Sequence, residues 1–270
     1  MSVGHYENFP VASILLPARL RKPVGLVYCF ARTADDFADE GDLAPAERLA
    51  RLEQYRDQLR RLEQNQPAQT PLFDALDGVV RAYDLPLQPF FDLLDAFSQD
   101  VTKSRYAEFA EVMEYCRRSA DPVGRLMLHL YGTAGDANLL QSDAICSALQ
   151  LINFWQDIAI DFRKNRIYLP QDEMARFCIT DSQIAAADAG GRWPDMMRFQ
   201  TERAREMLKF GAPLAKRLPG RIGLELRMIV QGGLRILEKL DAVRGDVYRH
   251  RPVLRAFDWP LMMLRALGMR

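Results

Sequence analysis

Hydrophobic residues recur at spacings of three and four along most of the chain, with charged residues between them. The segment that begins at Pro45 is typical, because its apolar side chains fall on one helical face: Leu49, Leu52, Tyr55, Leu59 and Leu62. Proline at the start of such a segment suits the first turn of a helix. The alternation expected of surface strands is scarce, and no Asn-Gly or Asp-Gly turn separates β-branched runs. The pattern predicts an all-α protein.

The same reasoning predicts helices over most of the remaining chain. They begin at Pro71 and after Pro86, and then cover residues 108–131 with a bend at Pro122, 143–164, 194–217 and 221–246, with Pro252 and Pro260 interrupting the last part. There is no internal repeat and no long linker. We therefore expect one all-α domain over residues 1–270, built as a bundle of many helices.

A first acidic patch stands out within this helical pattern. Asp35 and Asp39 are four residues apart, so they lie on one face of a helix, and Tyr28 and Arg32 precede them on that face. Acidic pairs at this spacing are also common on solvated helix faces, and the first patch alone does not separate the two interpretations.

A second acidic patch has a more informative setting. Gln150, Asn153, Asp157 and Asp161 follow one another at steps of three and four, which makes one polar stripe on a helix. The neighbouring residues are almost all apolar: Leu149, Leu151, Ile152, Phe154, Trp155, Ile158, Ile160 and Phe162. A helix that is apolar nearly all round is usually a central one. The stripe is therefore expected to face the interior of the bundle.

Carboxylates placed in such an interior need compensation for their charge. Unpaired burial of a charge is very costly, and divalent cations relieve that cost. Carboxylate and amide oxygens suit Mg²⁺, which keeps some waters and shares the phosphates of a substrate. Basic residues near in sequence offer another way to neutralise the acids without metal: Arg32, Arg163, Lys164 and Arg166.

Composition narrows the classes of protein further. The chain has 36 Lys and Arg against 36 Asp and Glu, so no net positive charge is available to attract nucleic acid. The four cysteines form no CxxC pair, which disfavours a zinc site and predicts reduced, mostly buried thiols: Cys29, Cys116, Cys146 and Cys178. No signal peptide or membrane-spanning segment is recognisable. We expect a cytoplasmic protein that does not bind nucleic acid.

Several motifs taken together resemble the squalene/phytoene synthase family over nearly the whole chain. Residues 28–39, Tyr-Cys-Phe-Ala-Arg-Thr-Ala-Asp-Asp-Phe-Ala-Asp, look like its first acidic motif. Residues 153–161, Asn-Phe-Trp-Gln-Asp-Ile-Ala-Ile-Asp, followed by Asn-Arg-Ile-Tyr-Leu-Pro at 165–170, look like its second. The stretches 5–10 and 115–119 fit as well. The resemblance implies a helical isoprenoid-synthase bundle around a central cavity.

The resemblance also assigns expected roles. Mg²⁺ would bridge the substrate diphosphate at Asp35, Asp39, Asn153, Asp157 and Asp161. Residues expected to hold diphosphate or line the cavity are Phe9, Tyr28, Arg32, Gln150, Arg166, Tyr168 and Arg251. Tyr115 matches the central active-site tyrosine, so the expected catalytic set is Tyr115 with the four aspartates. Ionisation of an allylic or cyclopropylcarbinyl diphosphate places charge on the leaving group, which Mg²⁺ and arginines stabilise. Aromatic faces then stabilise the carbocation.

Departures from the usual family pattern favour one branch of the family. Squalene and phytoene synthases generally carry Arg immediately before the second-motif aspartate, whereas this chain has Gln156. After the tyrosine they usually read Val-Ala-Gly, whereas this chain has Ser119-Ala120-Asp121-Pro122. These features are similar to the branch of bacterial hopanoid pathways that converts presqualene diphosphate and water to hydroxysqualene. Asp121 is a candidate for positioning the water, and its alternative is a residue that starts or kinks a helix. No NADPH is expected.

Two other functions remain as alternatives. One is head-to-head condensation of prenyl diphosphates to squalene, presqualene diphosphate or phytoene. The other is a non-catalytic helical scaffold, which the presence of all five expected metal ligands disfavours. Enzymes upstream and downstream in the pathway are candidate partners.

The C-terminal segment bears on localisation. Basic residues are interspersed with large apolar ones between residues 247 and 270, against a single acid, Asp258. This composition suits peripheral contact with the inner face of a membrane. The alternative is a final core helix with a solvated basic face.

Overall fold

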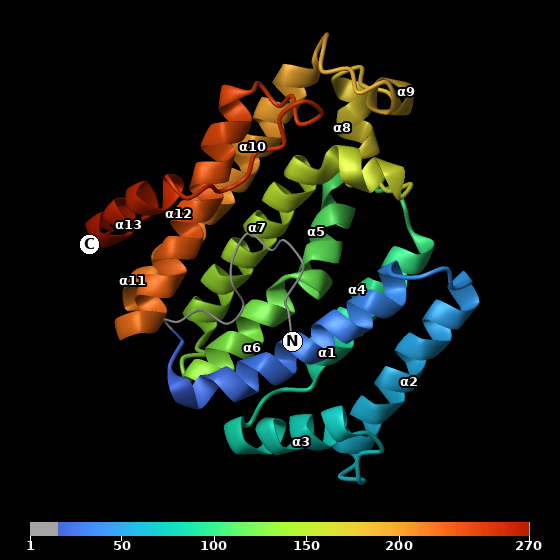
Figure 1. The fold of residues 1–270 in the computed structure, drawn as a ribbon, viewed down its shortest axis with the longest axis vertical. Helices are drawn as coiled ribbons and strands as arrows, with labels where there is room; N and C mark the ends of the chain where they lie inside the picture. Colours follow the sequence, from blue (N-terminus) through green and yellow to red (C-terminus); the bar gives the residue numbers. More distant parts are fainter. Residues whose placement is uncertain (1–15, 270) are drawn as a thin grey trace.

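Helices alone make up the regular structure of residues 16–269, which are the residues that the computed structural model describes (Figure 1). The all-α expectation is confirmed. The helices are α1 (Ala18–Asp39), α2 (Pro45–Glu63), α3 (Pro71–Tyr83), α4 (Gln88–Thr102), α5 (Phe109–Ser119), α6 (Asp121–Tyr131), α7 (Asp136–Arg163), α8 (Gln171–Arg176), α9 (Asp181–Ala185), α10 (Trp193–Gly211), α11 (Leu214–Arg217), α12 (Gly220–Ala242) and α13 (Asp258–Gly268).

Several of the expected helix boundaries are wrong. The expected helix over 108–131 is two helices, α5 and α6, which are separated at Ala120. The segment 194–217 is also divided, because α10 ends at Gly211 and Pro213 precedes the short α11. Pro260 does not interrupt the end of the chain, since it lies in the first turn of α13, where its missing N–H costs nothing.

Helix α7 is the central element, as its apolar sequence predicted. It begins at Asp136, seven residues before the expected start, and packs against α5, α6, α10 and α12 (Figure 1). Trp155 is fully buried on this helix. Close approach of α12 depends on Gly233, where a Cβ atom would lie 2.8 Å from Leu208 and 2.9 Å from Leu149. The acidic stripe of α7 is thus held in the middle of the bundle.

The cysteine thiols are free, as expected, but they are not mostly buried. Cys116 is buried and Cys146 is half-buried, whereas Cys29 and Cys178 are exposed. None of the helices within residues 16–269 combines the length and the apolar character needed to cross a membrane.

Candidate active site

The first acidic patch occupies the C-terminal half of α1. Arg32 binds both Asp35, at 3.2 Å, and Asp36, at 2.6 Å. Burial raises the pKa of Asp35 to about 6, and repulsion from Asp39 adds to the effect, whereas Arg32 opposes it. Asp35 therefore holds its negative charge at a free-energy cost that a cation would relieve.

Asp39 connects the two acidic patches across the bundle. Lys164, the residue after α7, lies 2.6 Å from one of its carboxylate oxygens, and Arg166 lies 2.6 Å from the other. Burial alone would raise the pKa of Asp39, but the hydrogen bond from Lys164 and the charge of Arg166 outweigh it, so the pKa is lowered. The C-terminal ends of α1 and α7 are thus held together.

The second patch lies on α7 beside the loop that follows α12. Arg251 makes a bidentate ion pair with Asp157, with Nε 2.5 Å from Oδ1 and Nη2 3.2 Å from Oδ2. Burial raises the pKa of Asp161 to about 7, and repulsion from Asp157 adds to this. Arg166 and Lys164 oppose the rise, and the charge of Asp39 adds a smaller effect in the same direction as Asp157.

Basic side chains therefore neutralise part of the acidic site, as the metal-free alternative proposed. Arg32, Lys164 and Arg166 each pair with an aspartate of the first patch, and Arg163 is exposed. Asp35 and Asp161 keep raised pKa values despite these pairs. Neutralisation is incomplete at these two positions, one on each helix.

Asp100, at the C-terminal end of α4, is a site residue that sequence reasoning missed. The Tyr115 hydroxyl donates a 2.7 Å hydrogen bond to its carboxylate, and the Tyr168 hydroxyl lies 3.5 Å from the other oxygen. Burial raises the pKa of Asp100 to about 7, although Arg166 and the bond from Tyr115 oppose the rise. No sequence signal distinguishes this single acid from a surface residue, because its partners come from α5 and from the segment after α7.

An aromatic wall adjoins this carboxyl group. The rings of Phe154 and Tyr168 stack with centroids 3.7 Å apart, and the ring of Tyr115 is 5.7 Å from that of Tyr168. Tyr28, on α1, is half-buried. Phe9 lies outside the described residues. Of the aromatic residues expected near the site, Tyr115 and Tyr168 therefore lie together there.

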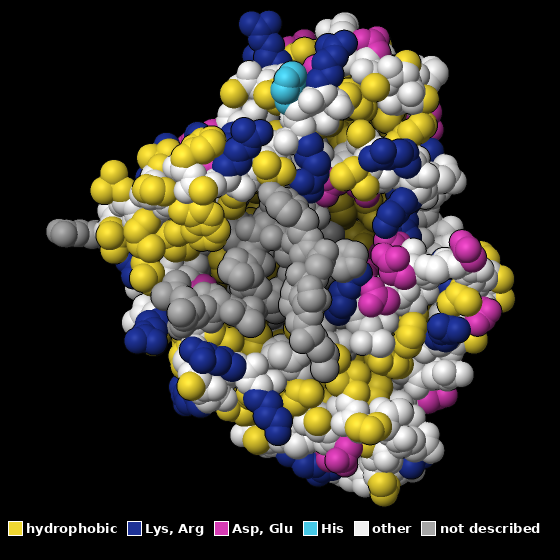
Figure 2. All heavy atoms as spheres, viewed as in Figure 1, with side chains coloured by type: hydrophobic (Ala, Val, Ile, Leu, Met, Phe, Trp, Pro, Cys, Tyr) yellow, Lys and Arg dark blue, Asp and Glu magenta, His cyan; other side chains and the backbone are white. Residues whose placement is uncertain are grey.

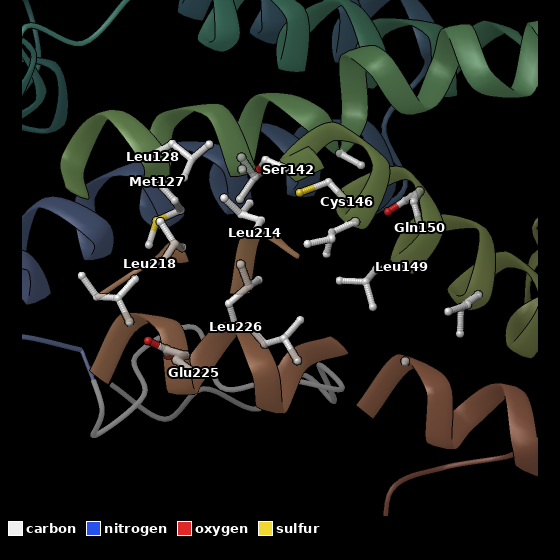
Figure 3. Close-up of a pocket in the computed structure, with 18 of the residues that line it drawn as sticks. Met127, Leu128, Ser142, Cys146, Leu149, Gln150, Leu214, Leu218, Glu225 and Leu226 are labelled. Atoms are coloured by element: carbon white, nitrogen blue, oxygen red, sulfur yellow. The ribbon is translucent and has the colours of Figure 1, made fainter. Parts of the chain in front are cut away.

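An apolar cavity of about 500 Å³ lies between α6, α7 and α12. Gln150 and Asn153 line it, and Asn153 precedes Asp157 by one turn of α7, so the cavity adjoins the acidic site. Figure 3 shows Leu149 and Cys146 on α7 and Leu226 on α12 around this space. Among its described lining residues, Glu225 is the single charged side chain. The charged site of aspartates and arginines therefore lies at one side of an apolar cavity that suits a hydrocarbon chain.

The two departures from the family pattern have structural explanations. Gln156 is buried, and its side-chain amide donates a 2.7 Å hydrogen bond to the carbonyl of Pro252. Asp121 is buried at the first position of α6 and accepts a 2.7 Å hydrogen bond from Ser147. It is not among the described residues that line the cavity. Its position favours the interpretation as a residue at the start of a helix over one as a water-positioning group.

The donor set bears on the expected magnesium. Within residues 16–269, no three His, Cys, Asp or Glu side chains converge closely enough to hold one ion by themselves. Mg²⁺ commonly binds through one or two carboxylates together with waters and substrate phosphates. Paired aspartates on two coupled helices, with raised pKa values at Asp35 and Asp161, fit that mode of binding. The residues present thus suit Mg²⁺ that arrives with a diphosphate.

Comparison with known proteins identifies the family. The family described as squalene/phytoene synthase matches residues 3–258. The chain belongs to the squalene/phytoene synthase family. The Asp-bearing segments of α1 and α7, which resemble the two acidic motifs of this family, lie together at the site.

Relatives within the squalene/phytoene synthase family carry more than one activity name. A hydroxysqualene synthase of Sinorhizobium fredii is 34% identical over 247 residues, which cover 90% of this chain and 83% of the relative. A phytoene synthase of Mycobacterium bovis is 31% identical over 218 residues, covering 80% and 71%. The crystal structure of squalene synthase HpnC from Alicyclobacillus acidocaldarius has a TM-score of 0.82 and 36% identity, covering 89% of this chain and 90% of that one. The protein is therefore an isoprenoid synthase of the squalene/phytoene type, which acts on a prenyl diphosphate.

Proposed function

We propose that the protein is a Mg²⁺-dependent hydroxysqualene synthase, which converts presqualene diphosphate and water to hydroxysqualene and diphosphate. The observation that carries the proposal is the junction between the acidic site and the apolar cavity at Asn153 and Gln150. A diphosphate at the coupled aspartates would extend its hydrocarbon into this cavity. The names of the relatives at 34–36% identity support the choice of product.

The basic residues of the site supply the first part of the mechanism. Cleavage of the carbon–oxygen bond leaves the electron pair on the diphosphate, and Mg²⁺, when bound, stabilises the charge of that leaving group. Arg32, Arg166 and Arg251 lie among the aspartates and would hold the departing diphosphate. Their ion pairs with the aspartates hold the guanidinium groups in position.

The aromatic wall and the cavity serve the second part. The faces of Tyr115 and Tyr168 would stabilise the cyclopropylcarbinyl cation and its rearranged form. The apolar lining excludes bulk water, so that one water attacks after rearrangement. The oxygen of this water forms the new carbon–oxygen bond, and one of its protons passes to solvent. The reaction takes up no electrons, so it needs no reductant. We therefore propose that NADPH is not required.

Gln156 is the feature that separates this proposal from condensation of two prenyl diphosphates. A neutral amide stands where condensing members generally carry an arginine, and it donates a hydrogen bond to the carbonyl of Pro252. The site thus lacks one positive charge for a second diphosphate. The phytoene synthase relative at 31% identity and the squalene synthase HpnC structure support the alternative, head-to-head condensation to squalene, presqualene diphosphate or phytoene.

A substrate of this hydrophobicity partitions into membranes. The proposal therefore includes a cytoplasmic protein in peripheral contact with the inner face of a membrane, and an exchange of substrate and product with enzymes that precede and follow it in hopanoid synthesis.

Product analysis tests the proposal directly. Purified protein is incubated with Mg²⁺ and presqualene diphosphate without NADPH, and the lipids are identified by mass spectrometry. Hydroxysqualene is the expected product. No turnover of presqualene diphosphate, together with consumption of farnesyl or geranylgeranyl diphosphate in a parallel reaction, would overturn it in favour of condensation.

A further inference from the structure

We infer that the outward face of α13 is a lipid-binding surface that seats the protein on a bilayer. At 100° per residue, five of its side chains fall within an arc of roughly 140°: Trp259, Pro260, Met263, Leu264 and Leu267. All five are exposed or half-exposed, and Leu264 is 70% exposed. A surface helix of an ordinary soluble protein presents charged and polar residues on this side.

Ion pairs on the opposite side fix the orientation of α13. Asp258 is fully buried and binds Arg235 at 2.7 Å and Lys239 at 2.5 Å, both on α12. Arg265 binds Glu238 of α12 at 2.5 Å. Asp258 and Arg265 are the two charged residues of α13, and both face α12. The helix thus directs its charges inward and its apolar arc outward, and it cannot rotate without breaking these pairs.

The packing between α12 and α13 shows that α13 buries a different set of apolar side chains against the protein core. Met262 and Ala266 of α13 are buried against Met228 of α12, so the helix already has its own apolar contact. Figure 2 shows hydrophobic side chains gathered over α12 and α13, with basic side chains beside them. The outward arc is additional apolar surface, beyond what holds the helix in place.

Three observations favour a bilayer as the occupant. The basic side chains of Arg249 and Arg255 are exposed just before α13, which suits anionic headgroups. Trp259 stands at the start of the arc, and tryptophan is typical of the boundary between headgroups and acyl chains. The arc has about five side chains, whereas a stable protein interface uses about 20–30 residues on each side.

The position of α13 relative to the cavity gives the surface a use. One side of α12 contributes Ile222, Leu226 and Ile229 to the cavity lining, and another side carries Met228 against α13. A single helix therefore separates the apolar arc from the cavity. A bilayer at α13 would place the cavity close to the phase that dissolves a prenyl substrate. The delivery of a prenyl substrate from the bilayer rests on the proposed function, whereas the binding of lipid by α13 does not.

Flotation of the full-length protein with lipid vesicles tests the inference without turnover. Vesicles of phosphatidylcholine alone and with phosphatidylglycerol are compared. We expect wild-type protein to float with both, and more with phosphatidylglycerol. The double variant L264S/L267S should lower the partition coefficient at least about tenfold, since burial of even one leucine side chain contributes a factor of that order. L140S/F210S is the matched control, because Leu140 and Phe210 are also exposed but lie on α7 and α10.

Tryptophan fluorescence supplies a second readout. Trp155 and Trp193 are fully buried, so a shift of emission to shorter wavelength on addition of vesicles would report Trp259. The W259F variant should lose this shift. The inference is overturned if wild-type protein does not float, if L264S/L267S floats like wild type, or if the control loses as much binding. It is also overturned if wild type is a dimer that L264S/L267S converts to a monomer.

Discussion

The side-chain amide of Gln156 donates a 2.7 Å hydrogen bond to the carbonyl oxygen of Pro252. The next residue of α7, Asp157, binds Arg251, which precedes Pro252, through two hydrogen bonds. Two successive residues of α7 therefore hold two successive residues of the loop after α12. The neutral residue attaches the loop backbone, and the acidic residue orients its guanidinium group.

Replacement of Gln156 by alanine should weaken both the fold and substrate binding. The buried carbonyl of Pro252 would lose its donor, which costs about 1–3 kcal/mol of unfolding free energy. Arg251 would then be less well positioned, so KM should rise more than kcat falls. Urea denaturation and steady-state kinetics measure the two effects. An unchanged midpoint and KM would contradict the proposed attachment.

Replacement of Asp35 or Asp157 by alanine should remove Mg²⁺-dependent turnover. Each change deletes an oxygen donor and leaves a basic partner without its acid, so we expect a loss of about 10²–10³-fold or more in kcat. Asp42→Ala is the matched control, because Asp42 is exposed beyond the end of α1. Circular dichroism checks that each variant is folded. Full activity in either site variant would exclude its assignment as a metal ligand.

Thermal stability should depend on Mg²⁺ and diphosphate together. A ligand that binds only the folded state stabilises it by about 2.7 kcal/mol at 100 times its dissociation constant. We expect Tm to rise with both ligands present, and to rise much less with Mg²⁺ alone, because no three acidic or other ligating side chains within residues 16–269 converge on one ion. Asp157→Ala should lose the rise. An equal rise with diphosphate in the presence of EDTA would indicate that the basic residues suffice.

Asp100 should make the protein less stable as pH rises. Its pKa is about 7 in the fold against an ordinary value of 3.8, so the folded state binds the proton more tightly. The proton on Asp100 therefore contributes most to stability below pH 4, and this contribution is lost as pH rises to about 7. Asp100→Asn removes the titration, so the variant should gain stability over wild type progressively between pH 4 and 7.

The size of this effect is measurable by thermal denaturation. A difference of about 1 kcal/mol corresponds to about 2–4 °C in Tm for a protein of this size. Asp57→Asn, an exposed acid on α2, is the control and should follow the wild-type pH dependence. If Asp100→Asn parallels wild type at every pH, its carboxyl group has an ordinary pKa.

Asp121 is expected to act on stability and not on the product. Its carboxyl group accepts a hydrogen bond from Ser147 between α6 and α7, so Asp121→Ala should cost about 1–3 kcal/mol. The ratio of hydroxysqualene to other lipids should stay the same. A changed ratio, measured by mass spectrometry, would restore Asp121 as a candidate for positioning the water.

The sequence by itself determined the all-α class and the family. Apolar periodicity is a local property of consecutive residues, so it indicated the central position of α7 before any contact was known. Asp35 with Asp39, and Asp157 with Asp161, were found for the same reason, since a spacing of four places side chains on one helical face. The breaks at Ala120 and after Gly211 were missed, because helix ends depend on packing as well as on local preference.

Only the tertiary structure decided what surrounds those acids. Lys164 and Arg166 meet Asp39, and Tyr115 meets Asp100, across separations in sequence that no periodicity encodes. The outward direction of the apolar arc of α13 depends likewise on the pairs that Asp258 makes with α12. Long-range contacts arise from the joint packing of many helices, whereas periodicity along the chain reports one helix at a time.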